Sequence, residues 1–146
     1  MSKNYRFIEE RSKVVLPGFM ASANAFLERI KFVKILNEAL NWDPKQWHVS
    51  PGVLLKAVIL NTFTRSRAPL YQIGRAYADI DTERLFGKGV TPNKLTDAAI
   101  GKALERVYDS NAGKLFQTLS LSLFKKFEIP IKRLHSDTTS VSFGFV

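Results

Sequence analysis

The 146-residue sequence contains no cysteine, which excludes disulfide bonds and thiolate ligands for a metal ion. Its two histidines, His48 and His135, are too few for a zinc site built from imidazoles. No apolar run approaches the roughly 18 residues that cross a bilayer, and the first residues lack the apolar core of a signal peptide. We therefore expect a cytoplasmic protein with no membrane partner.

Acidic residues are also scarce. The chain has 13 Asp and Glu against 22 Lys and Arg, which gives a net charge of +9. This imbalance predicts a polyanionic partner, and nucleic acid is the commonest one. Because the basic residues are spread along the chain, the charge indicates a class of partner and no particular site. A hydrophobic fraction of 45% with 11 Phe favours a folded core over disorder.

Helical periodicity dominates the chain before residue 129. Between residues 21 and 40, apolar residues recur at steps of three and four, as one helix or as two short helices with a break near residues 31–33. Ser50 and Pro51 are typical of a helix N-cap and first helical position, and the apolar residues after them predict a central, buried helix. Thr96 or Asp97 caps a later helix. Its predicted buried line consists of Ile100, Leu104, Val107 and Tyr108.

A basic turn follows the predicted central helix. A second helix is predicted from Pro69 through residue 78, and the pair has two interpretations: a helix-turn-helix that reads DNA bases, or a helical hairpin whose basic turn faces solvent. On the first interpretation Arg65, Arg67 and Arg75 bind DNA. The hydroxyls of Thr62 and Thr64 are then within reach of phosphate oxygens.

Residues 112–127 carry an apolar seam that is close to a heptad repeat. Its members are Leu115, Leu119, Leu123 and Phe127. We expect this seam to pack on neighbouring helices, with self-association as the alternative. Lys125 and Lys126 end the same segment, either as cations that hold a DNA backbone or as solvated charges that favour the helix dipole.

Over residues 129–146 the hydrophobic period changes to two, which predicts a strand. Asp137 falls within it, although Asp is disfavoured inside a strand. It is either a metal-ligand carboxylate or an edge-strand residue that faces water. Lys132 and Arg133, just before it, are predicted to bind the DNA backbone, and the alternative is that they are solvated edge-strand charges.

Residues 134–140, Leu-His-Ser-Asp-Thr-Thr-Ser, resemble the first catalytic strand of the DDE transposases of the IS4-related IS1634 group. Residues 49–52 (Val-Ser-Pro-Gly), 85–87 (Leu-Phe-Gly) and 95–104 (Leu-Thr-Asp-Ala-Ala-Ile-Gly-Lys-Ala-Leu) resemble the region that precedes that strand. The resemblance implies a mainly α chain. Residues 1–128 would form a helical N-terminal domain, and residues 129–146 would begin an incomplete RNase H-like α/β domain.

In that family the position of Asp137 is the first of three acidic ligands for Mg²⁺ or Mn²⁺. The intact enzymes cleave DNA and transfer strands at the ends of an insertion sequence. The other two carboxylates come from segments far downstream, whereas this chain ends nine residues after Asp137. We therefore expect a truncated transposase, inactive alone, that at most binds insertion-sequence DNA, another copy of itself or the full-length transposase. The alternative is a stand-alone basic helical DNA-binding module with no catalytic ancestry.

Overall fold

The computed structural model describes residues 18–64 and 67–130, and within them the chain is helical, with no strand. The α-helices are α1 (Gly18–Arg29), α2 (Phe32–Ala39), α3 (Pro51–Asn61), α4 (Ile73–Ala76), α5 (Thr82–Phe86), α6 (Asp97–Asp109) and α7 (Ala112–Lys126). Three short 3-10 turns join them: η2 (Pro44–Gln46), η3 (Leu70–Gln72) and η4 (Pro92–Lys94). The mainly α class is confirmed. Of the predicted strand and RNase H-like domain, residues 131–146 lie outside the described residues.

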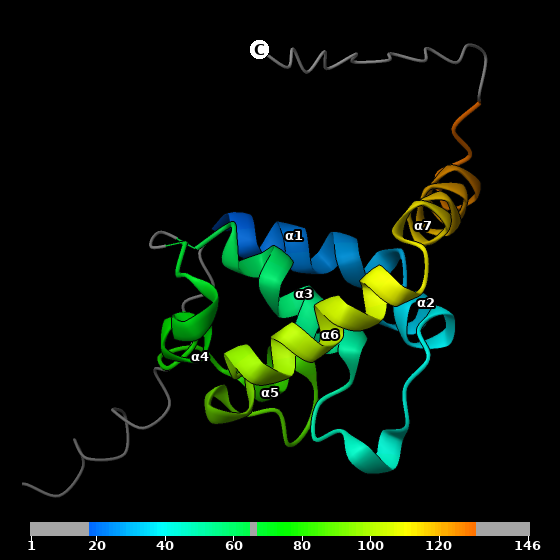
Figure 1. Ribbon diagram of the computed structural model, residues 1–146. Coiled ribbons are helices and arrows are strands. Elements are labelled where there is room, and N and C mark those ends of the chain that lie inside the picture. Colours follow the sequence, from blue (N-terminus) through cyan, green and yellow to red (C-terminus); the bar gives the residue numbers. More distant parts are fainter. Residues whose placement is uncertain (1–17, 65–66, 131–146) are drawn as a thin grey trace, which may run out of the picture.

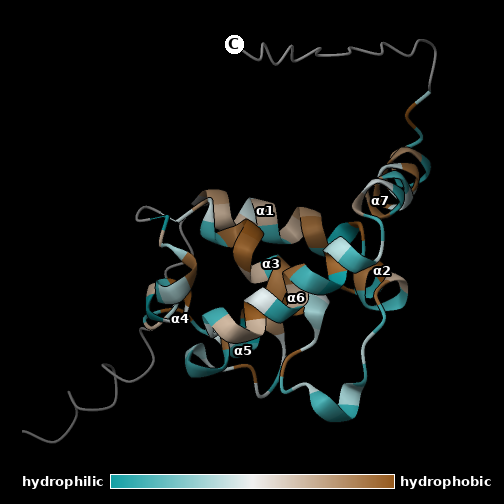
Figure 2. Cartoon of the chain, in the orientation of Figure 1, coloured by the Kyte–Doolittle hydropathy of each residue, from teal (hydrophilic) through white to brown (hydrophobic). Residues whose placement is uncertain are grey.

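Helix α3 is the centre of the fold, with α1 and α6 on either side of it (Figure 1). Its start follows the predicted chemistry, because the Ser50 hydroxyl accepts a hydrogen bond from the Val53 amide and Pro51 occupies the first turn. Figure 2 shows hydrophobic residues gathered along α3. Leu54, Ala57 and Leu60 are fully buried, so α3 presents apolar surface to several neighbours at once.

Helices α2 and α3 approach each other closely at Gly52. A Cβ atom there would lie 2.7 Å from the Val33 carbonyl oxygen, so no larger residue fits without moving the backbone. The Asn37 side chain fills the crossing, accepting a bond from the Gly52 amide (2.8 Å) and donating one to the Ser50 hydroxyl (3.0 Å). The position of α2 is thereby fixed on α3 by backbone contact and by an amide side chain.

The predicted break in the first helical segment lies at Lys31, which confirms two helices rather than one. Lys31 adopts a left-handed backbone conformation (φ 56°) and its amide bonds the Glu28 carbonyl oxygen (2.9 Å), which ends α1 and redirects the chain into α2. Phe32 and Leu36 then face the core from α2. The break brings the ends of two helices, with their basic residues, to one place on the surface.

Two expectations about the later helices are wrong. The helix predicted over residues 69–78 is a 3-10 turn followed by the single helical turn of α4, and Tyr77 after it is buried, its hydroxyl donating to the Ala57 carbonyl oxygen (2.7 Å). Burial raises the pKa of this phenol above its usual range. In α6, Leu104 and Tyr108 are exposed (39% and 85%), because Ile100 and Ala103 form the side that meets the core.

Lys56 is the only buried charged side chain in the described part of the chain. It lies on α3, and its ammonium donates to the Glu28 carboxylate of α1 (2.5 Å) and to the Leu85 carbonyl oxygen of α5 (2.7 Å). The Phe86 ring lies 5.6 Å from the ammonium, in range of a cation–π contact. One side chain therefore connects three helices.

We predict that Glu28→Ala lowers the free energy of unfolding by about 1–3 kcal/mol, because it leaves a buried ammonium without its counter-charge. Lys56→Met removes the charge itself and should destabilise the fold less. Glu38→Ala, which removes the partner of exposed Lys34, is the control and should change stability by about 0.5 kcal/mol or less. Urea unfolding followed by circular dichroism measures all three. A smaller loss for Glu28→Ala than for Lys56→Met would contradict this account of the pair.

Candidate nucleic-acid interface

Arg67 and Arg75 are the two sequence-predicted site residues that the structure describes. Arg65, Lys132, Arg133 and Asp137 lie outside the described residues. Arg67 is exposed, with its amide bonded to the Thr64 hydroxyl (3.1 Å). Arg75 lies on α4 and lines a pocket of about 270 Å³ near the start of α6, and Arg67 is not part of that lining. The structure does not bring these two arginines to one site.

The geometry of the basic turn favours the hairpin interpretation over a base-reading helix-turn-helix. Helix α4 has four residues, which is about 6 Å of helix and too short to lie along a major groove. Buried Asn61 holds the turn through two hydrogen bonds to the backbone of Ala68. The Thr62 and Thr64 hydroxyls donate to backbone carbonyl oxygens of α3 rather than pointing to a partner.

The structure gathers basic side chains at a different place, between the α1–α2 break and the end of α7. A pocket of about 450 Å³ lies there, which we call the basic groove. Among the described residues, its charged lining comprises Arg29, Lys31, Lys34, Lys125 and Lys126, with Glu38 as the single carboxylate. Glu38 lies 3.7 Å from the Lys34 ammonium, so within this part of the chain four cations of the groove have no acidic neighbour there.

Local structure explains how these cations meet. Arg29 ends α1, Lys31 occupies the left-handed position of the break, and Lys34 follows in α2. Lys125 and Lys126 form the last turn of α7, where cations interact favourably with the helix dipole. Helix α7 packs on α2 and α6 at one end of the molecule (Figure 1), which sets these two groups of cations on opposite walls.

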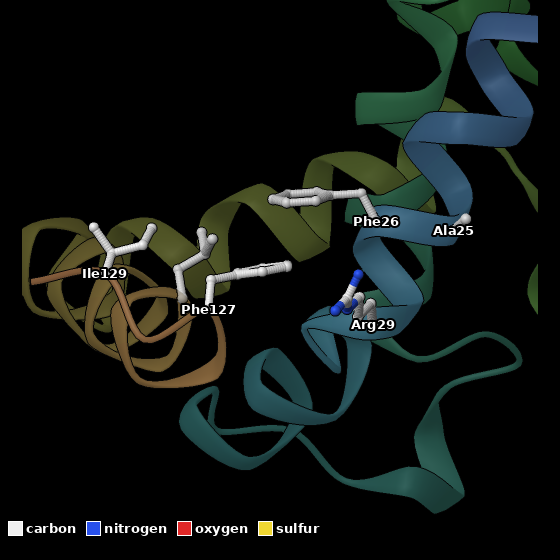
Figure 3. A pocket seen from close by; sticks show the side chains of 6 residues that line it. Ala25, Phe26, Arg29, Phe127 and Ile129 are labelled. Atoms are coloured by element: carbon white, nitrogen blue, oxygen red, sulfur yellow. The ribbon is translucent and has the colours of Figure 1, made fainter.

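An apolar cleft of about 510 Å³, which we call the aromatic cleft, lies beside the basic groove (Figure 3). Its lining residues are Ala25, Phe26, Arg29, Leu123, Phe127 and Ile129. The Phe26 and Phe127 rings are nearly parallel (8°), with centroids 5.9 Å apart. The Arg29 guanidinium lies 4.9 Å from the centroid of Phe127. Arg29 lines both the groove and the cleft, so the two form a continuous surface.

Sequence reasoning identified only one wall of this surface. Lys125 and Lys126 were candidates for DNA contact, whereas Arg29, Lys31 and Lys34 were not. The seam residues Leu115, Leu119, Leu123 and Phe127 do pack against the core, as predicted. The predicted break near residues 31–33 was the sequence feature that could have located the second wall, because a helix break at Lys31 exposes several cations close together.

Within residues 18–64 and 67–130, no three His, Cys, Asp or Glu side chains gather in a way that would hold a metal ion. None of the helices in this part of the chain is long and apolar enough to cross a membrane. The described surface therefore offers cations and aromatic rings rather than acidic ligands. This combination suits a polyanion that carries flat, apolar groups.

Comparison with known proteins gives one match. No curated protein and no solved structure matches the chain. One family model, described as a domain of unknown function (DUF4277), matches residues 18–121, from the start of α1 into α7. This domain is found in transposase-like proteins. The match includes α1, α2 and most of α7, and the chain belongs to the DUF4277 family.

Proposed function

We propose that this chain is the helical DNA-binding domain of a DDE transposase of the IS4-related IS1634 type, with DNA at insertion-sequence ends as its partner. The observation that carries the proposal is the family match over residues 18–121, because that domain is found in transposase-like proteins. The Leu-His-Ser-Asp-Thr-Thr-Ser segment at residues 134–140 supports it, since it follows the matched region in the chain, after residues 122–133, as the resemblance implies.

DNA binding is assigned to the basic groove. Four cations without an acidic neighbour line a space of about 450 Å³, so the phosphates of a DNA backbone would replace bulk counterions there. Arg65, Arg67, Arg75, Lys132 and Arg133 remain proposed DNA contacts in addition to the groove. The exposed apolar side chains of α7, Phe116 and Leu121, are available to a second transposase subunit.

Asp137 is the proposed catalytic residue and metal ligand of this family's chemistry. Two-metal phosphoryl transfer needs several carboxylates to hold a pair of Mg²⁺ ions about 3.5–4 Å apart. No Asp or Glu follows Asp137 in this sequence, and the described residues contain no acidic cluster. One carboxylate does not fit such a site, and we assign no cleavage step to this chain alone.

The contribution of the basic groove is measured by the salt dependence of DNA binding. The triple variant Lys31→Gln, Lys125→Gln, Lys126→Gln should reduce the slope of log affinity against log salt by about 1 for each lost phosphate contact. The control triple Lys45→Gln, Lys88→Gln, Lys114→Gln removes the same charge from exposed positions outside the groove and should leave the slope nearly unchanged. Equal reductions in both triples would mean that binding depends on total charge alone. Arg65→Ala with Arg67→Ala tests the basic turn in the same assay.

The transposase assignment predicts sequence preference. A duplex with the terminal inverted repeat that borders the coding gene should bind at least about 10³-fold more tightly than a shuffled duplex at equal salt, as specific sites generally do. Fluorescence anisotropy with both duplexes provides the measurement. Equal affinities would support a stand-alone, non-specific basic module instead.

A nuclease assay tests the role of Asp137. With Mg²⁺ or Mn²⁺ the purified chain should leave supercoiled DNA intact, because a single carboxylate does not organise two metal ions. Asp137→Ala should behave like the unmodified chain in this assay. Reproducible cleavage that Asp137→Ala abolishes would show instead that the chain assembles a complete metal site, for example between subunits.

A further inference from the structure

We propose that the aromatic cleft binds an unpaired DNA base while the basic groove holds the adjoining phosphates, so that this surface takes single-stranded DNA. The inference deepens the proposed DNA binding and rests on it. It concerns the form of the DNA at this surface: a closed duplex contacts the basic groove alone, whereas a strand whose bases are free to leave the stack also places one base in the cleft.

The cleft has the size and lining of a ligand site. Its volume of about 510 Å³ falls within the range of about 300–1,000 Å³ that is typical of small-molecule pockets. Phe26 and Ile129 are left 44% and 46% exposed there, although exposure of large apolar side chains to water is unfavourable. A ligand with a flat, apolar face would cover both residues.

The aromatic geometry favours a nucleobase over an aliphatic ligand. Phe26 and Phe127 lie in nearly parallel planes, and the planar Arg29 guanidinium lies over the Phe127 ring, so flat groups follow one another along the cleft (Figure 3). Proteins that bind single strands use such faces as stacking platforms beside a basic groove, and each stacked base contributes about 5- to 150-fold in affinity.

The cleft adjoins the basic groove, so a ligand whose flat group enters the cleft places its neighbouring negative charges against the cations of the groove. Arg29 lines both, and at the end of α7 the cleft residues Leu123 and Phe127 flank the groove residues Lys125 and Lys126 in the sequence. A nucleotide combines a flat base with a phosphate in the same way. A second copy of this chain, with its own net charge of +9, would place cations against cations at the groove. In a closed duplex the bases are stacked inside and do not reach the cleft.

The experiment compares three fluorescein-labelled ligands of equal length in titrations of the full chain: single-stranded DNA, the same strand with abasic sites, and a blunt duplex. We expect the ordinary strand to bind about 5- to 150-fold more tightly than the abasic strand, which keeps the phosphates and lacks the bases. Phe26→Leu retains apolar volume and removes the flat face. It should bring the ratio close to 1 while the affinity for the abasic strand stays the same.

Two controls separate the cleft from the rest of the surface. Phe116→Leu changes an exposed phenylalanine of α7 outside the cleft and should leave the ratio unchanged. Lys125→Gln with Lys126→Gln should weaken the ordinary and abasic strands equally. Thermal unfolding of Phe26→Leu shows whether it remains folded at the assay temperature; if it does not, Phe26→Met, which also removes the flat ring and retains apolar volume, replaces it and should likewise bring the ratio close to 1.

The inference is overturned if the ordinary and abasic strands bind equally, or if Phe26→Leu and Phe116→Leu have the same effect. Tighter binding of an RNA strand, or full competition by a free mononucleotide at matching concentration, would also overturn it by assigning the surface to another ligand. A dimer that Phe26→Leu dissociates would assign the cleft to a second copy. If no DNA binds even at low salt, the proposed function itself fails; if duplex binding depends on the groove but the abasic strand binds as well as the ordinary one, only this inference fails.

Discussion

The buried ammonium of Lys56 is the interaction on which the arrangement of the helices depends. Removing an ammonium from water costs several kcal/mol, so a lysine is retained in a core only where charge-assisted bonds offset that cost. Here the Glu28 carboxylate and the Leu85 carbonyl oxygen provide them, from helices on either side of α3. Moving α1 or α5 away from α3 would leave this charge without one of its partners, so a single side chain favours the observed arrangement of the three helices.

The basic groove follows from that selection. Glu28 stands one residue before Arg29, so the contact that anchors α1 to Lys56 also fixes the place where α1 ends. The left-handed Lys31 then sends the chain into α2, whose distance from α3 is set by Gly52 and Asn37. The positions of Arg29, Lys31 and Lys34 therefore depend on core contacts that other residues of α1, α2 and α3 make. Coulomb repulsion among these cations destabilises the folded state, and the core contacts offset it. Such a cluster of like charges is typical of a surface that binds an oppositely charged ligand.

The sequence predicted features that depend on neighbouring residues and missed those that depend on distant ones. Ser50 and Pro51 determine a helix start by local hydrogen bonding and backbone geometry, so that start was predictable. The length of α4 was not, because its C-cap, Tyr77, is fixed by a side-chain hydrogen bond to Ala57, twenty residues earlier. In α6, Ala103 faces the core with Ile100 while the larger Leu104 does not, so the size of an apolar side chain did not indicate the buried side. The basic groove joins residues about ninety positions apart, and periodicity carries no information on which helix faces reach the same place.

Helix α7 is held less firmly than the wall it faces. Of its fifteen residues, Leu115 alone is fully buried, and the helix begins at Asn111, whose left-handed backbone (φ 63°) forms the joint with α6. One wall of the groove, formed by α1 and α2, is thus anchored in the core. The other wall, the end of α7, is attached to the core mainly through the apolar seam. Ligand contacts on both walls would add to the few buried contacts that hold this helix in place. Larger apolar side chains along the seam would hold α7 more firmly against the core. They would then tighten ligand binding without touching the ligand, by slowing its dissociation.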